Sequence, residues 1–163
     1  MKINIIYFTS TGNTRWVLDR INGCFTEAGH ETAIIDSIGC KIATSIDCDL
    51  LGLVFPVWGS SAPEPILEFI ANLPEGGGKK VFILGNAGMD AWDTGMYLSK
   101  KLKPKGYEVV YTGNVILPMN SSFPGLQFIK KRAPQKSALM FEYAENTIKR
   151  ASKMILSGKK YFE

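Results

Sequence analysis

Apolar runs alternate with amphipathic stretches along the whole chain. The runs have the length and β-branched content of strands, and most are followed by a segment whose apolar residues recur at helical spacing. This alternation is typical of a parallel sheet with helices on both faces. We predict strands at 2–8, 31–36, 49–55, 80–85 and 107–117, and helices at 13–28, after Pro63, at 92–103 and at 135–157, with a short helix or turn at 41–46.

The helical spacing also predicts which side chains face the sheet. In the helix at 92–103 they are Met96, Leu98 and Leu102. In the helix at 135–157 they are Leu139, Met140, Tyr143, Ala144, Ile148, Ala151, Met154 and Ile155. The pattern suits a three-layer, doubly wound α/β fold with five parallel strands in the order 2-1-3-4-5. In such a fold a ligand lies beyond the carboxyl ends of the strands.

The segment richest in candidate ligand-binding side chains follows the first predicted strand. The segment there consists of Thr9, Ser10, Thr11, Gly12, Asn13 and Thr14. Hydroxyls and an amide between a strand and a helix N-terminus make a socket for phosphate. The segment has no Lys or Arg, so we expect one phosphate monoester rather than a triphosphate. Another interpretation is that Ser10 or Thr11 merely caps the helix.

This segment resembles the phosphate loop of the flavodoxins, whose pattern is T/S-x-T-G-x-T, and the likeness extends over the chain in strand order and length. It is greatest to the flavodoxin modules of bacterial flavodoxin/ferredoxin fusion proteins. The resemblance implies one flavodoxin-like domain over residues 1–163 that binds a single FMN without a covalent bond. The chain would be a stand-alone version of such a module, or a fragment.

The loop after the third predicted strand contains Pro56, Val57, Trp58 and Gly59. It resembles the flavodoxin loop that packs an aromatic ring on the isoalloxazine and turns a backbone carbonyl toward flavin N5. Trp58 is the expected wall, and Gly59 would let the peptide after Trp58 change conformation, because glycine reaches positive φ without steric cost. The competing interpretation is an ordinary core tryptophan followed by an ordinary turn.

The loop after the fourth predicted strand contains Asn86, Ala87 and Gly88, small residues whose backbone would read the pyrimidine edge of the flavin. Flavodoxins often place a tyrosine in this loop against the outer face of the ring, whereas this chain has Met89 and Trp92. Trp92 either stacks on the flavin or packs on the core. The two interpretations have equal weight.

The resemblance implies an electron carrier that shuttles single electrons between redox proteins, a reductase and a ferredoxin-like or other acceptor. The alternative is an NAD(P)H- or quinone-linked FMN reductase of the same fold, and a third is a binding module without a cofactor. No catalytic residue and no metal site are expected. The only histidine, His30, follows Gly29 in a turn far from the three loops.

Charge is unevenly distributed. Residues 1–129 hold 10 basic and 12 acidic residues, whereas residues 130–163 hold 9 basic and 3 acidic ones. A solvated helix surface is the favoured explanation over docking of an acidic partner, and no motif indicates nucleic-acid binding. We expect no membrane span and, without a signal peptide, a cytoplasmic protein. The long connection at 118–134 is expected to cover the ring edge, contact a partner or form ordinary surface.

Overall fold

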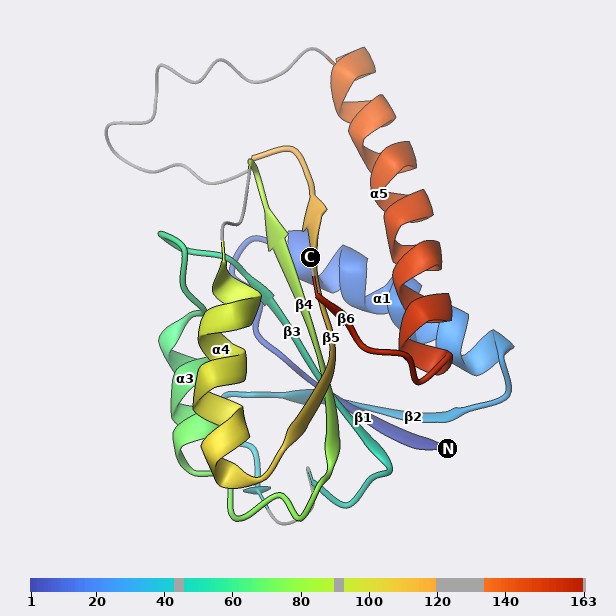
Figure 1. Ribbon diagram of the computed structural model, residues 1–163. Helices are drawn as coiled ribbons and strands as arrows, with labels where there is room; N and C mark the ends of the chain where they lie inside the picture. The colour runs from blue at the N-terminus through green and yellow to red at the C-terminus, as the bar shows by residue number, and fades with distance from the viewer. Residues whose placement is uncertain (43–45, 90–92, 120–133, 163) are drawn as a thin grey trace.

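The apolar runs form the strands of one parallel sheet, in a computed structural model that describes residues 1–42, 46–89, 93–119 and 134–162. The sheet order is β2-β1-β3-β4-β5-β6, as Figure 1 shows. The strands are β1 (Lys2–Tyr7), β2 (Glu31–Asp36), β3 (Leu50–Pro56), β4 (Lys80–Ala87), β5 (Glu108–Ile116) and β6 (Tyr161–Phe162). The predicted order of the first five strands is confirmed.

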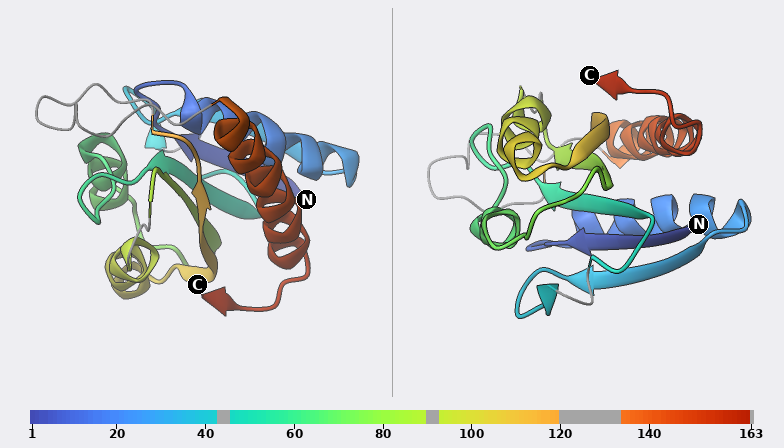
Figure 2. Two further views of the ribbon diagram at one scale, coloured as in Figure 1. Left: turned by 90° about the horizontal axis from the view of Figure 1, so that it is seen from above. Right: turned by 60° about the horizontal axis from the view of Figure 1, so that its bottom comes forward.

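The helices cover both faces of the sheet, so the three-layer α/β prediction is confirmed (Figure 2). One face carries α1 and α5, and the other carries α3 and α4. The bounds are α1 (Asn13–Glu27), α3 (Glu64–Ala71), α4 (Thr94–Leu102), α5 (Pro134–Leu156) and the 3-10 helix η1 (Lys103–Lys105). Half of the helix predicted at 41–46, residues 43–45, lies outside the described residues.

The sheet has six strands, so the prediction of five is wrong. After α5 the chain turns at Gly158 and the two residues of β6 pair in parallel with β5. Tyr161 stacks on Tyr111, with ring centroids 5.7 Å apart. A two-residue strand is too short to leave a periodic pattern, and a tertiary contact with β5 stabilises it.

Two apolar cores lie between the sheet and its helices. Gly52 on β3 permits one of them to close, because a Cβ there would overlap the ring of Phe82. Phe82 in turn packs edge-on against Phe25 of α1 at 5.6 Å. The apolar face of β3 therefore depends on a residue without a side chain in the middle of the strand.

Three side chains predicted to face the core are exposed. Met96 lies on the outer side of α4, whose buried residues are Thr94, Leu98 and Leu102. Leu139 and Tyr143 are 64% and 70% exposed. The N-terminal half of α5 extends beyond the edge of the sheet in Figure 1, so its apolar spacing has little core to face. The predicted burial of Ala144, Ile148, Ala151 and Ile155 is confirmed.

Candidate functional site

The loops that follow β1, β3 and β4 lie at one edge of the sheet, because parallel strands end at the same side. We name them loop 1 (residues 8–12), loop 2 (57–61) and loop 3 (88–93, of which 90–92 lie outside the described residues). β1 and β3 are neighbours although β2 separates them in sequence. The switch in strand order therefore brings loops 1 and 2 together.

Loop 1 leads into an α1 N-terminus that no side chain caps. The N-cap residue is Gly12, with φ 95°, and no side-chain hydrogen bond closes the first turn. The Gly12 N–H instead donates to Thr9 Oγ1 at 3.3 Å. Ser10 and Thr11 are exposed. Gly12, rather than Ser10 or Thr11, therefore occupies the N-cap position.

Loop 1 is also electrically neutral. Residues 8–14 contain no ionisable side chain, and the first turn of α1 has no acidic residue. Arg15 forms an ion pair with Asp19 at 2.9 Å, one turn further along the helix. The positive end of the α1 dipole and the N–H groups of its first turn thus attract anions to loop 1.

Thr14 and Asn86 join the first turn of α1 to the end of β4. Both residues are buried, at 1% and 5% exposure, and Thr14 Oγ1 donates to Asn86 Oδ1 at 2.6 Å. The Asn86 backbone carbonyl accepts a hydrogen bond from Val57 N at 2.8 Å. Asn86 therefore contacts both α1 and loop 2.

Loop 2 is a tight turn. Trp58 N donates to Ser61 O at 2.9 Å, and Ser61 N donates to Trp58 O at 3.0 Å. Both central residues have positive φ, 53° at Gly59 and 65° at Ser60. The Trp58 carbonyl, which we expected to turn toward a ligand, is thus engaged within the turn. The Gly59–Ser60 peptide is the one that can rotate while both turn hydrogen bonds remain.

Trp58 lies at the surface of the site rather than in the core. Its side chain is 49% exposed, which excludes the ordinary-core interpretation. Phe8 at the start of loop 1 packs edge-on against it, with ring centroids 5.6 Å apart at 90°. An exposed indole held by a second aromatic ring can provide a flat wall for a planar ligand. Phe8 directly precedes the motif of Thr9–Thr14, and only the tertiary contact indicates its role.

Loop 3 closes against the chain that leaves β5. Leu117 N donates to Ala87 O at 2.8 Å, and Asn13 Nδ2 donates to Pro118 O at 2.8 Å. Gly88 lies so close to Met119 that a Cβ there would overlap the methionine side chain. Pro118 and Met119 therefore lie beside the candidate site. The alternatives predicted for their connection were that it covers the ring edge, contacts a partner or forms ordinary surface.

Some predicted features cannot be placed. Trp92 lies outside the described residues, as does most of the connection at 118–134. Pro56 and Val57 are half-buried at the end of β3, and Ala87 and Gly88 are half-buried next to each other at the end of β4. Met89 is exposed beside them.

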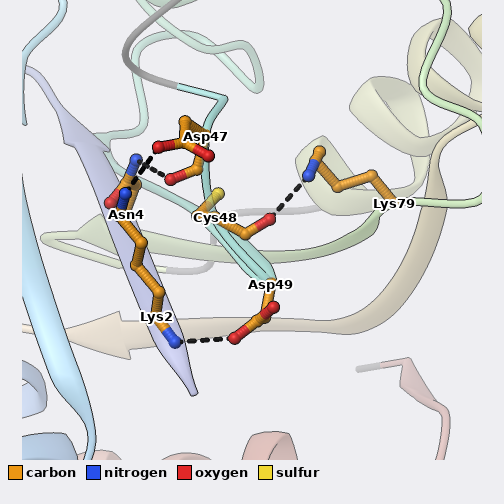
Figure 3. A network of polar contacts seen from close by, with 6 residues as sticks. All are labelled: Lys2, Asn4, Asp47, Cys48, Asp49 and Lys79. Atoms are coloured by element: carbon orange, nitrogen blue, oxygen red, sulfur yellow. Dashed lines mark hydrogen bonds and ion pairs between the residues drawn. The ribbon is translucent and has the colours of Figure 1, made fainter.

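A second polar cluster lies at the opposite edge of the sheet, around Lys2 and Cys48 (Figure 3). Lys2 Nζ contacts Asp47 at 2.6 Å, and the Lys2 backbone N–H donates to Asp49 at 2.8 Å. The hydrogen bond to Lys2 lowers the pKa of Asp47, and the same bond raises the pKa of Lys2. Burial raises the pKa of the Cys48 thiol, which disfavours its reactive thiolate form.

Metal ligation and membrane insertion find no support in the described part of the chain. Among those residues, no three His, Cys, Asp or Glu side chains gather as metal ligands. None of the described helices combines the length and apolar character that a membrane crossing requires.

Solved structures resemble this chain over nearly its whole length, although no protein-family model and no curated protein sequence matches it. Oxidised flavodoxin 2 from Bacillus cereus is 18% identical, with 96% of this chain and 99% of that chain covered and a TM-score of 0.71. Two-electron reduced flavodoxin from Megasphaera elsdenii is 20% identical, with 93% and 98% covered and a TM-score of 0.66. An azoreductase from Bacillus anthracis is 12% identical, with 92% and 99% covered and a TM-score of 0.58. This chain therefore has the flavodoxin-like fold.

Proposed function

We propose that this chain is a flavodoxin-like electron carrier that binds one FMN without a covalent bond and passes single electrons between redox proteins. The partners would be a reductase and a ferredoxin-like or other acceptor. The observation that carries the proposal is the uncapped N-terminus of α1 beside a neutral hydroxyl loop, at the edge of the sheet where Trp58 is exposed. The similarity to flavodoxin structures supports it.

The phosphate of FMN would bind to loop 1 and the first turn of α1. Each hydrogen bond to a charged group contributes roughly 1.5–3 kcal/mol, so four or five neutral donors with the helix dipole behind them suffice for a dianion. The residues assigned to this part are Thr9, Ser10, Thr11, Gly12, Asn13 and Thr14. The absence of Lys and Arg from the loop disfavours a triphosphate.

The flavin ring would lie against Trp58, with the backbone of Ala87 and Gly88 near its pyrimidine edge. Bound FMN supplies the redox chemistry, and the protein supplies orientation and hydrogen bonds that set its potentials. The Gly59–Ser60 peptide lies beside Trp58 and has the freedom to present either its carbonyl or its N–H to the ring. Loop 2 would thereby respond to the protonation state of a bound flavin.

The direct test is to titrate the apoprotein with FMN and with riboflavin, which lacks the phosphate. A ligand of about 30 heavy atoms at roughly 0.3 kcal/mol per atom gives about 9 kcal/mol, so we expect a sub-micromolar Kd for FMN. Riboflavin should bind at least tenfold more weakly. A protein that stays colourless after FMN is added would instead be a binding module without this cofactor, and the proposal would be wrong.

An FMN reductase of the same fold is the second candidate. Structural similarity to azoreductases favours it, as does the half-exposed face of Trp58, since a reductase must leave room for a substrate. Stepwise reduction monitored by electron paramagnetic resonance separates the two. A carrier should accumulate a flavin radical near half reduction, whereas a reductase should oxidise NAD(P)H rapidly with a quinone and show little radical.

A further inference from the structure

The helices α3 and α4 lie side by side on one face of the sheet, as Figures 1 and 2 show. Both begin at the carboxyl edge and end at the amino edge, because each connects two neighbouring parallel strands. At the amino edge, Lys105 Nζ donates to the carbonyls of Ala71 and Leu73 at 2.9 and 2.8 Å, which joins η1 to the end of α3. The two helices thus form one layer with a common direction.

This layer carries its charges in two separate groups. Residues 64–78, which contain α3, hold three acidic and no basic residues. Residues 94–106, which contain α4 and η1, hold four basic and no acidic residues. Among residues 1–42, 46–89, 93–119 and 134–162, no ion pair joins the two groups. Two neighbouring helices of opposite charge therefore do not neutralise each other.

The side chains that point away from the sheet form one row on each helix. Glu64 and Glu68 are one turn apart on α3, and both are exposed on the side opposite its buried residues. Met96 and Lys100 have the same spacing on α4 and are exposed, and Lys103 continues their row in η1. Residues three or four apart share one face of a helix. The α3 row is therefore acidic, and the α4 row is basic after Met96.

A two-fold axis parallel to the helices and midway between them would make this layer complementary to itself. Rotation about such an axis lays α3 of one copy on α4 of another, in the same direction, and forms the same contact twice. Glu68 and Lys100 both lie in the second turn of their helices, so they fall at a similar depth. The acidic row of each copy would then face the basic row of the other.

We propose that the outer faces of α3 and α4 bind a second copy of this chain and form a two-fold dimer. Glu64 and Glu68 of one copy would pair with Lys100 and Lys103 of the other. An acidic protein fits this layer less well, since α3 repels it while α4 attracts it. Dimerisation goes beyond the proposed function, and none of these four residues belongs to loops 1–3.

The contact should be weak and should depend strongly on salt. Besides charges it offers the partly exposed side chains of Met96 and Tyr97, at 46% and 39% exposure. We therefore expect a dimer Kd between about 1 µM and 1 mM. Raising the salt from about 0.01 to about 1 M shortens the Debye length from about 30 to about 3 Å and should weaken association at least tenfold. The same charges also suit the dipoles of their own helices, which by itself predicts no association.

Charge reversal with a rescue tests the dimer by sedimentation equilibrium, which needs no flavin. Glu64→Lys/Glu68→Lys makes both rows basic, and Lys100→Glu/Lys103→Glu makes both rows acidic. Each variant alone should dimerise at least about tenfold more weakly than the wild type, because like charges then face each other. An equimolar mixture of the two variants should regain wild-type association, since a mixed pair places opposite charges in both contacts.

A matched control reverses two exposed charges on the other face of the sheet. Lys136→Glu/Lys153→Glu lies on α5 and should associate like the wild type. A measurement on the unaltered protein serves if a variant does not fold. A zero-length carbodiimide crosslinker, applied to an equimolar mixture of ¹⁴N- and ¹⁵N-labelled chains, should join Glu68 to Lys100 in peptides that carry both labels. Only a contact between copies can produce such peptides.

Four results would each overturn the dimer. They are a wild-type protein that stays monomeric up to about 1 mM at low salt, a mixture no more associated than its components, a control weakened as much as the variants, and crosslinks without mixed labels. Binding of an acidic ferredoxin to a monomeric wild type through Lys100 would assign the α4 row to another partner and would overturn it as well. A failure to bind FMN would refute the proposed function and leave all these outcomes unaffected.

Discussion

The two edges of the sheet carry similar kinds of residues but use them differently. At the amino edge, polar side chains bond to one another and to backbone carbonyls. Lys2 pairs with Asp47, and Lys79 Nζ donates to Cys48 O at 2.6 Å (Figure 3). At the carboxyl edge, the first turn of α1 has no side-chain cap, and Thr14 Oγ1 donates to Asn86 Oδ1 at 2.6 Å.

Glycines with positive φ occur at both edges, so they do not distinguish a site by themselves. At the amino edge the loop with Gly77 and Gly78 is closed by the neighbouring turn, where Gly78 N donates to Gly106 O at 2.7 Å. At the carboxyl edge an added Cβ would meet nothing within 4 Å at Gly12 or Gly59, and the same is true at Gly77 and Gly78. The uncapped first turn of α1, rather than glycine conformation, distinguishes the carboxyl edge.

The largest expected effect comes from matched glycine substitutions at the two edges. Gly12 and Gly29 have φ of 95° and 81°, and an added Cβ meets nothing within 4 Å at either. Valine should strain both, at about 1–2 kcal/mol of unfolding free energy each. Only Gly12→Val should also displace the first-turn donors. The loss of two charged hydrogen bonds should raise the FMN Kd by at least about 100-fold. Equal FMN affinities in the two variants would contradict the phosphate assignment.

A smaller effect is expected from paired threonine substitutions at the two ends of α1. Thr11→Val removes an exposed hydroxyl in loop 1 and should weaken FMN about tenfold while sparing riboflavin. Thr26→Val removes a hydroxyl that bonds only to the α1 carbonyls of Asn22 and Gly23. Isothermal titration should show unchanged flavin binding in this control, and weaker FMN binding in both variants would indicate a general loss of structure.

The aromatic wall formed by Trp58 should contribute less to flavin binding, and it should contribute equally for flavins with and without a phosphate. Trp58→Leu should weaken FMN and riboflavin by the same three- to tenfold factor, because stacking contributes about 0.5–1.5 kcal/mol. Trp58→Phe is the control, since it retains a ring against Phe8. A loss confined to FMN would place Trp58 at the phosphate rather than at the ring.

Stability changes of opposite sign are expected from reciprocal substitutions at two turns. Ser60 has φ 65°, which is unfavourable for a residue with a side chain, and Gly77 has φ 56°. Ser60→Gly should raise the free energy of unfolding by about 0.5 kcal/mol, after the greater entropy of glycine in the unfolded chain is subtracted. Gly77→Ser should lower it by a similar amount. Urea denaturation of the apoproteins would measure both, and a destabilised Ser60→Gly variant would indicate a favourable contact made by the serine.

The smallest effect is expected at the ion pair of the amino edge. Because Lys2 lowers the pKa of Asp47, the stability from this pair is present above the ordinary pKa of Asp and is lost as the pH falls below about 4. The raised pKa of Lys2 means that this stability is lost again above about pH 10.5. Asp47→Asn should therefore differ slightly from wild type only between these limits, and less in high salt. FMN affinity should not change; if it did, the two edges would be coupled.

Periodicity predicted the layers and the order of the first five strands, because alternation of strands and helices leaves few packings of a parallel sheet. The local motif of loop 1 likewise indicated a phosphate socket. Periodicity did not predict the structure correctly where a segment has no core to face, or where its pairing partner lies far away in the sequence. Leu139 and Tyr143 have core spacing on a part of α5 that extends past the sheet, and β6 exists through its contact with β5.

The sequence by itself determined the fold class and the residue types of the three loops, because both follow from local patterns of apolar, small and hydroxyl-bearing residues. Only the tertiary structure decided which atoms of those residues remain available to bind a ligand. It directs the Thr14 proton to Asn86, engages the Trp58 carbonyl with Ser61 and sets Phe8 against Trp58. Such pairings join segments up to 72 positions apart, and a hydrogen bond between distant segments has no signature in the sequence around either partner.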